Sequence, residues 1–260
     1  MKRNKVKHTL AEGGVAIGTM MFEFPTDGIA RLAASAGAEF AMFDMEHTGW
    51  SIETIRRLMA TSRPTDLVPM VRVPATQYHF IARVLDVGAM AIMVPMVHTA
   101  EQARMIQQSA HYPPVGQRGA AFMIAHDDYA EGEVTAKIER SNEEILTICQ
   151  IESVQGLENV DAIAAVEGVD MLWVGNFDLS ISMGIPGQFE HPRFLRALER
   201  TVEACQRHGK TAANLATDPD EGAQRLKEGF RCLAYGGDLW LYRTALRAGI
   251  EQIRSSVWRR

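Results

Sequence analysis

Eight short apolar runs recur along the chain, and a stretch with the amphipathic pattern of a helix follows each of them. Several runs, such as AMAIMVPMV, are hydrophobic almost throughout, which is typical of parallel strands buried on both faces. Eight such units predict an α/β protein, a (β/α)8 TIM barrel in a single domain that spans residues 1–260. The runs cover residues 14–22, 39–46, 67–74, 89–97, 145–152, 170–175, 211–216 and 231–236.

An open doubly wound sheet would use the same elements and is the alternative fold. It ranks second because the chain has no GxGxxG turn of the kind that opens such sheets. A length of 260 residues is usual for one barrel. The three cysteines, Cys149, Cys205 and Cys232, are widely spaced in apolar segments, so we expect reduced core thiols.

The charge and hydropathy of the chain argue against two classes of partner. A net charge of -5 gives no electrostatic footprint for nucleic acid. No stretch of about 18 uninterrupted apolar residues offers a membrane span. The basic residues near Met1 are not followed by the apolar run of a signal peptide, so we expect a cytoplasmic protein.

Two segments break the alternation of strands and helices. Residues 111–143 form a long polar connection after the fourth run, and residues 179–192, rich in glycine and proline, follow the sixth. Long connections in compact domains are often functional. We expect both at the carboxyl-terminal rim of the barrel, where barrel enzymes place their active sites.

Polar residues stand at the ends of the second and third runs. The second ends FDMEH, where Asp44 and Glu46 share one face of the strand and His47 begins the loop. The third ends VRVP, which places Arg72 at the rim. These side chains are candidates for function because a polar group that points into a barrel must be satisfied or used.

The fifth and sixth runs carry further polar residues. The fifth reads ILTICQIES, so Gln150 and Glu152 point the same way from an otherwise apolar strand. The sixth ends WVGNFDLS, where Gly175 allows the backbone to approach a ligand and Asp178 lies at the rim. Oxygen donors without cysteine suit a hard divalent ion such as Mg²⁺ or Mn²⁺, so we expect Glu152 and Asp178 to be metal ligands.

Each of these residues also has a structural interpretation. Asp178 could cap the next helix, Arg72 could form a purely structural pair with Asp44, and His47 alone is more simply an ordinary histidine. Function is favoured jointly, because all of them fall on one rim of the predicted barrel. Arg72 would then bind a carboxylate or enolate oxygen, and His47 would move protons near neutral pH.

Lysine placement distinguishes two routes to aldol chemistry. A Schiff-base enzyme needs a desolvated lysine at the mouth of the barrel. The six lysines lie near the start of the chain, in helical segments, or, for Lys210, at the opposite rim. The lysine positions therefore favour the metal-dependent route.

The motifs FDMEH, VRVP, YPPVGQRG, CQIES and VGNFDLS occur in this order nearly end to end along the chain. In this order and spacing they resemble the metal-dependent pyruvate aldolases of the HpcH/HpaI family. The resemblance implies that Glu152 and Asp178 hold the metal (Mg²⁺, Mn²⁺ or Co²⁺). It also implies that Gln150, Gly175 and the backbone near Phe177 contact the substrate.

The resemblance further implies that His47 is the base and that an aspartate raises its basicity. The family pattern points to Asp86, and Asp44 is the rival partner. Asp86 precedes the fourth strand, on the wrong rim of its own barrel, so it could reach His47 only from a neighbouring subunit or through an unexpected bend. Similar proteins form homo-oligomers, trimers or hexamers, and exchange their last helix, for which residues 239–257 are the candidate segment.

The expected reaction is reversible cleavage of a 4-hydroxy-2-oxo acid to pyruvate and an aldehyde. One alternative keeps the same site but lets oxaloacetate lose CO₂, as in decarboxylases or related synthases. A non-catalytic subunit that binds a metal or an oxo acid is a third interpretation, for which the sequence offers no docking domain. The residues name neither the aldehyde nor the pathway.

Overall fold

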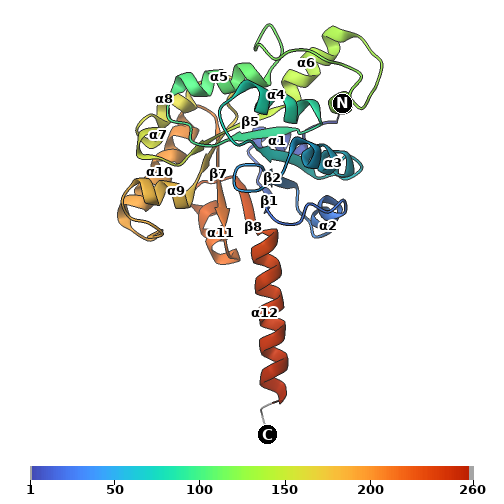
Figure 1. Cartoon of the computed structure of the whole chain (residues 1–260). Helices are drawn as coiled ribbons and strands as arrows, with labels where there is room; N and C mark the ends of the chain where they lie inside the picture. The colour runs from blue at the N-terminus through green and yellow to red at the C-terminus, as the bar shows by residue number, and fades with distance from the viewer. Residues whose placement is uncertain (1, 258–260) are drawn as a thin grey trace.

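A computed structural model describes residues 2–257 and contains eight parallel strands that close into a barrel (Figure 1). Each strand pairs with the next in sequence, and β8 returns to pair with β1. The predicted (β/α)8 fold is therefore confirmed, and the open sheet is excluded. The strands are β1 (Ala16–Met21), β2 (Phe40–Asp44), β3 (Val68–Arg72), β4 (Ala91–Val94), β5 (Leu146–Ile151), β6 (Met171–Val174), β7 (Thr211–Ala216) and β8 (Cys232–Gly237).

Helices surround the barrel, and α1 precedes the first strand (Figure 1). Between residues 2 and 257, no helix combines the length and the apolar character that crossing a bilayer requires. The helices are α1 (Lys5–Ala11), α2 (Ile29–Ser35), α3 (Ile52–Ser62), α4 (Tyr78–Asp86), α5 (Ala100–Ala110), the 3-10 turn η1 (Ala125–Asp127), α6 (Val134–Glu144), α7 (Val154–Glu158), α8 (Val160–Ala164), α9 (Asn176–Ser182), α10 (Pro192–Arg207), α11 (Pro219–Lys227) and α12 (Asp238–Val257).

The core has two layers, and the strands divide their side chains between them. Met42 and Ile148 belong to the cluster that fills the barrel, whereas Phe43 and Cys149 belong to the larger cluster between strands and helices. This alternation follows the two-residue period of a strand. It also explains the polar ends, because Asp44 and Gln150 continue the inward-facing series to the mouth of the barrel.

Local signals in the sequence place the helix starts. Ser51 and Asp218 accept hydrogen bonds from backbone N–H groups in the first turns of α3 and α11, and Thr99 forms a capping box with Gln102. Such caps satisfy donors that have no partner within the helix. The three buried cysteines are free thiols, as expected.

One expectation about the connections was wrong. Residues 111–143 follow α5 and lead into the start of β5, so the segment begins and ends at the amino-terminal side of the barrel. The physical reason is that α5 runs antiparallel to β4 and has already returned the chain from the carboxyl-terminal rim. Residues 179–192 do reach that rim, where Phe189 lines the cavity described below.

Only the start of the last helix lies against the barrel. α12 is 20 residues long and extends away from it as a rod (Figure 1). Tyr242, Leu246, Ile250 and Ile253 are exposed on it at helical spacing, which forms an apolar stripe. The helix starts at Asp238, one residue before the segment predicted for exchange between subunits.

Candidate active site

A cavity of about 440 Å³ opens at the carboxyl ends of the barrel strands. No lysine is among the residues that line it, which agrees with the absence of a Schiff-base lysine at the mouth. Six of the predicted site residues line this cavity: His47, Arg72, Gln150, Gly175, Phe177 and Asp178.

Arg72 is held by two carboxylates from the end of β2 and the loop that follows. Its Nε lies 2.5 Å from Oδ1 of Asp44, and its Nη1 lies 3.0 Å from Oε2 of Glu46. Asp44 is fully buried and Arg72 is 6% exposed, so this cluster is screened from water. Neither contact uses Nη2 of Arg72, which leaves that edge of the guanidinium for a ligand in the cavity.

His47 is the exposed member of the group. Its backbone N–H donates to Oδ2 of Asp44 at 2.8 Å, while its ring Nε2 lies 3.6 Å from Oε2 of Glu46. The ring thus has Glu46, rather than Asp44, as its carboxylate neighbour. The sequence pattern had placed Glu46 on the correct face but had given it no role.

Glu152 is buried beside the cavity, and its two oxygens have separate partners. Oε1 accepts a hydrogen bond from the backbone N–H of Met96, and Oε2 accepts one from Nε2 of Gln150, both at 2.6 Å. The other amide atom of Gln150, Oε1, is buried without a hydrogen-bond partner. Such a group calls for a donor that a ligand can supply.

The pKa of Glu152 is raised to about 7, first by burial and then by the nearby charges of Glu46 and Asp178, while the hydrogen bond from Met96 and the charge of Arg72 oppose the shift. The pKa of Glu46 is also raised, first by burial and then by Asp44 and Asp178, although Arg72 and His47 oppose the shift. Several carboxyl groups therefore share a site in which full ionisation is costly without a cation.

This donor set fits a hard divalent ion. The candidate ligands, Glu152 and Asp178, offer carboxylate oxygens, and Gln150 adds an unpaired amide oxygen. Between residues 2 and 257, no three acidic, histidine or cysteine side chains form a ready-made metal cage. Glu152, Asp178 and Gln150 would form only part of a coordination shell, which substrate and water would complete in a catalytic site.

Gly175 lines the cavity and packs closely against Glu152, so the absence of a side chain there is needed for space. A Cβ atom there would lie 2.4 Å from Oε2 of Glu152 and 2.8 Å from Nε2 of Gln150. We expect Gly175→Ala to displace Glu152, lower the free energy of unfolding by about 1–3 kcal/mol and lower any activity that uses Glu152 about 100-fold. Urea unfolding and pyruvate methyl exchange measure these effects, with Gly28→Ala, which meets open space, as the unaffected control.

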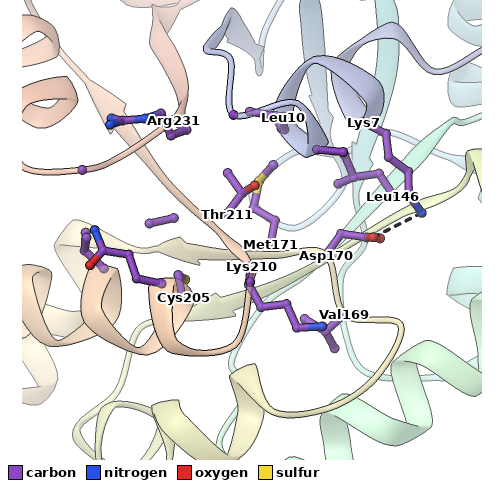
Figure 2. A pocket seen from close by; sticks show the side chains of 17 residues that line it. Lys7, Leu10, Leu146, Val169, Asp170, Met171, Cys205, Lys210, Thr211 and Arg231 are labelled. Atoms are coloured by element: carbon purple, nitrogen blue, oxygen red, sulfur yellow. Dashed lines mark ion pairs between the residues drawn. The ribbon is translucent and has the colours of Figure 1, made fainter.

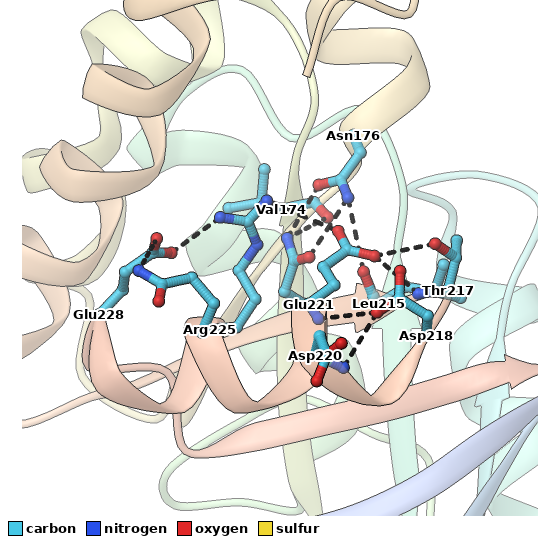
Figure 3. A network of polar contacts seen from close by, with 11 residues as sticks. Val174, Asn176, Leu215, Thr217, Asp218, Asp220, Glu221, Arg225 and Glu228 are labelled. Carbon is cyan, nitrogen blue, oxygen red and sulfur yellow. Dashed lines mark hydrogen bonds and ion pairs between the residues drawn. The ribbon is translucent and has the colours of Figure 1, made fainter. Parts of the chain in front are cut away.

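Asp178 lies in the first turn of α9 and does not cap it. The N-cap position is Gly175, and no side chain supplies a cap hydrogen bond there. Instead, a pair of amides ties the start of α9 to β7. Nδ2 of Asn214 donates to Oδ1 of Asn176 at 2.8 Å, and the reverse bond measures 3.2 Å (Figure 3). Neither amide was among the residues predicted to join these elements, although Asn214 is a polar residue in an apolar strand.

Asp86 lies apart from the other predicted site residues. It is the last residue of α4, and its carboxylate pairs with the buried Arg118 at 2.6 Å. The guanidinium of Arg118 also lies over the ring of Tyr112, 4.6 Å from its centroid. Within one chain Asp86 therefore has a partner of its own, and its role toward His47 stays a prediction.

A second cavity of about 450 Å³ lies at the opposite end of the barrel (Figure 2). It is lined by the first residues of strands, including Leu146, Met171 and Thr211, together with Lys7 and Asp170, which form an ion pair of 3.2 Å. The amino-terminal face of such barrels usually serves stability. None of the predicted site residues lines this cavity, so the candidate site is the one at the carboxyl ends.

Comparison with known proteins assigns the chain to a family. The family model for HpcH/HpaI aldolase/citrate lyase matches residues 20–245. The chain belongs to this family. HpcH/HpaI relatives include the 2-keto-3-deoxy-L-rhamnonate aldolase of Salmonella gallinarum, which is 34% identical over 252 residues, 97% of this chain and 94% of the relative.

Solved structures of similar proteins agree with this fold. The HpcH/HpaI aldolase from Desulfitobacterium hafniense has a TM-score of 0.92 and 30% identity, covering 96% of both chains. The citrate synthase SbnG has a TM-score of 0.86 and 29% identity, covering 96% of this chain and 98% of its own. The family resemblance inferred from the ordered motifs is thereby confirmed.

Proposed function

We propose that the protein is a divalent-metal-dependent aldolase that reversibly cleaves a 4-hydroxy-2-oxo acid to pyruvate and an aldehyde. The observation that carries this proposal is the composition of one cavity and its wall. Asp178, Arg72 and His47 line the cavity without a lysine. The buried carboxyl groups of Asp44 and Glu152 contact the lining residues Arg72 and Gln150 from behind. The similarity to an aldolase of 2-keto-3-deoxy sugar acids supports the same class of reaction.

A divalent ion held by Glu152 and Asp178 would act as a Lewis acid that polarises the keto oxygen of the substrate. Arg72, oriented by Asp44 and Glu46, would direct its remaining N–H donors to the oxygen on which enolate charge develops. Because these donors are fixed before the substrate enters, little reorganisation is needed when the charge appears.

His47 is the proposed base. In cleavage it would accept the proton of the C4 hydroxyl as the bond between C3 and C4 breaks, and in the reverse direction it would return that proton to the new alkoxide. Its exposure at the cavity leaves room for a substrate, and Glu46 would stabilise the imidazolium. Gln150 would accept a hydrogen bond through its unpaired oxygen.

Deuterium exchange into pyruvate tests the enolisation half of the reaction. With Mn²⁺ in D₂O, the methyl signal of pyruvate should decay in the proton NMR spectrum, and EDTA should stop the decay. Cleavage of a 4-hydroxy-2-oxo acid tests the other half of the reaction. Lactate dehydrogenase in the same assay measures the pyruvate that forms. If the methyl protons of pyruvate do not exchange in the presence of the protein, whether or not metal is added, the proposal is refuted.

Oxaloacetate is the second substrate to assay, because one structurally similar relative is a citrate synthase. Loss of CO₂ from oxaloacetate would give the same pyruvate enolate at the same site. If oxaloacetate is consumed and 4-hydroxy-2-oxo acids are not, the protein is a decarboxylase or synthase rather than an aldolase.

We further propose that α12 packs against a second copy of the chain in a homo-oligomer. An exposed apolar stripe on a helix that leaves its own barrel calls for a partner surface. The double substitution Leu246→Glu and Ile250→Glu should convert the oligomer to monomers in sedimentation velocity. Arg247→Glu, an exposed control on the same helix, should leave it assembled; a monomeric wild-type protein would contradict the proposal.

A further inference from the structure

We infer that the outer half of the cavity selects uncharged aldehydes with an apolar, above all an aromatic, body and rejects aldehydes that end in a carboxylate. This inference rests on the proposed aldolase function and names the class of its acceptor. It concerns the part of the cavity beyond Arg72 and Asp178, which binds whatever lies past the reacting carbonyl.

Two aromatic pairs line this outer part. Phe22, which follows β1, lies 5.1 Å from Trp240 of α12, measured between ring centroids. Phe177 of α9 lies 5.1 Å from Phe189 in an edge-to-face arrangement. Aromatic walls of this kind bind flat apolar groups through burial and ring contacts.

The wall formed by Phe22 and Trp240 is fixed in place by Asp238. This carboxylate, at the start of α12, accepts hydrogen bonds from the backbone N–H groups of Phe22, Glu23 and Phe24 at 2.8–3.0 Å. The loop after β1 and the first turn of α12 are thereby joined. The aromatic surface is preorganised for a ligand rather than formed by one.

The charges in the outer cavity are acidic. Glu23 and Glu221 line it, and Arg72 is the single lysine or arginine among the lining residues described. Glu221 is held by Thr217, whose backbone N–H and hydroxyl donate to its Oε2 at 2.8 and 2.9 Å (Figure 3). Its Oε1 lies 3.5 Å from Nη2 of the buried Arg225, which does not line the cavity. The proposed function commits the remaining N–H donors of Arg72 to the enolate oxygen, and Asp44 and Glu46 hold the guanidinium in place, so Arg72 does not also pair with a carboxylate at the far end of the aldehyde.

An acceptor that ends in a carboxylate would thus lose hydration without finding a cation and would face two like charges. Unpaired charge and like-charge contact are the elements by which sites reject a competing ligand. An apolar acceptor has neither cost and gains burial against the aromatic pairs. The geometry therefore separates acceptors by the group at the end of the aldehyde chain.

Three aldehydes of the form R–CH₂CH₂–CHO test this directly with pyruvate and Mn²⁺. They are butanal, 3-phenylpropanal and succinic semialdehyde, which differ in the terminal group while the carbon beside the carbonyl stays the same. We expect kcat/KM for 3-phenylpropanal to exceed that for butanal about tenfold, and that for succinic semialdehyde to fall about tenfold below butanal. The opposite order, or equal values, would overturn the inference.

Variants assign the selectivity to the residues named. The double change Glu23→Gln and Glu221→Gln should raise the rate ratio of succinic semialdehyde to butanal about tenfold, whereas Asp220→Asn, outside the cavity on the same helix as Glu221, should not. Phe177→Leu with Trp240→Leu should lower the ratio of 3-phenylpropanal to butanal about tenfold. Tyr129→Leu, a change at an exposed aromatic residue outside the cavity, is the control.

Each ratio is taken on one preparation, so the fraction of folded protein cancels. Failure of the two ideas is distinguishable because pyruvate exchange needs no aldehyde. If exchange proceeds but the aldehyde ratios are flat, the acceptor inference alone falls. If exchange is absent, saturation-transfer NMR on the metal-free protein tests the acceptor inference by binding alone. We expect 3-phenylpropan-1-ol to bind and 4-hydroxybutanoate not to bind. Binding of 4-hydroxybutanoate without binding of 3-phenylpropan-1-ol would overturn the inference.

Discussion

The substitution Glu152→Gln is expected to leave a folded protein that no longer enolises pyruvate. Glutamine is nearly isosteric, and its amide oxygen can still accept the hydrogen bond from Met96. The change removes one of two proposed carboxylate ligands, so we expect weaker Mn²⁺ binding and a fall in methyl exchange of about 1000-fold, which is about 4 kcal/mol of transition-state stabilisation.

Mn²⁺ binding by electron paramagnetic resonance and exchange by NMR measure the two effects separately. Thermal unfolding should show a stability equal to or above that of the parent protein, because a buried carboxyl with a raised pKa is replaced by a neutral group. Glu139→Gln, an exposed acid on α6, is the matched control. An exchange rate within a few fold of the parent would show that Glu152 holds no metal.

Changing Arg72 should have the second largest effect. Arg72→Lys keeps the charge but loses the planar fork that contacts Asp44 and Glu46 at the same time. We expect kcat/KM for cleavage to fall about 100- to 1000-fold, and the free energy of unfolding to fall by about 1–2 kcal/mol. Steady-state kinetics and urea unfolding measure these changes.

Arg72→Met separates the structural role of Arg72 from its proposed role. It leaves Asp44 buried without its cation, so the free energy of unfolding should fall by about 3–5 kcal/mol. If Arg72→Lys is as stable as the parent and equally active, Arg72 is only a partner for Asp44. That outcome would support the structural interpretation from the sequence, in which Arg72 only pairs with Asp44.

Strands and inward-facing residues could be predicted because each depends on local pattern. The run that contains Gln150 and Glu152 is apolar almost throughout and matches β5, Leu146–Ile151, to within one residue at each end. The two-residue period then places both polar side chains on the inner face. Burial of Glu152 and its contact with Gln150 follow from that placement.

Features that depend on contacts between distant segments could not be predicted from the local sequence pattern. Within one chain the ring of His47 lies against Glu46, because the turn after β2 directs Asp44 to the backbone N–H of His47. The pair of Asn176 and Asn214 joins residues 38 positions apart. The aromatic pair of Phe22 and Trp240 joins the first strand to the last helix across the closure of the barrel.

The placement of residues 111–143 failed for a different reason. The segment was judged from its own composition, although its position depends on the direction in which α5 runs. None of its residues lines the cavity at the carboxyl ends of the strands. Its one clear link to a predicted site residue is the ion pair of Arg118 with Asp86, away from that cavity.

Anomalous scattering from crystals grown with Mn²⁺ and pyruvate tests the central claim most directly. The account predicts one strong peak at the mouth of the barrel, within about 2.3 Å of carboxylate oxygens from both Glu152 and Asp178, with pyruvate completing the coordination. A peak bound to other residues, or a barrel mouth that holds pyruvate with no manganese beside these two acids, would contradict it.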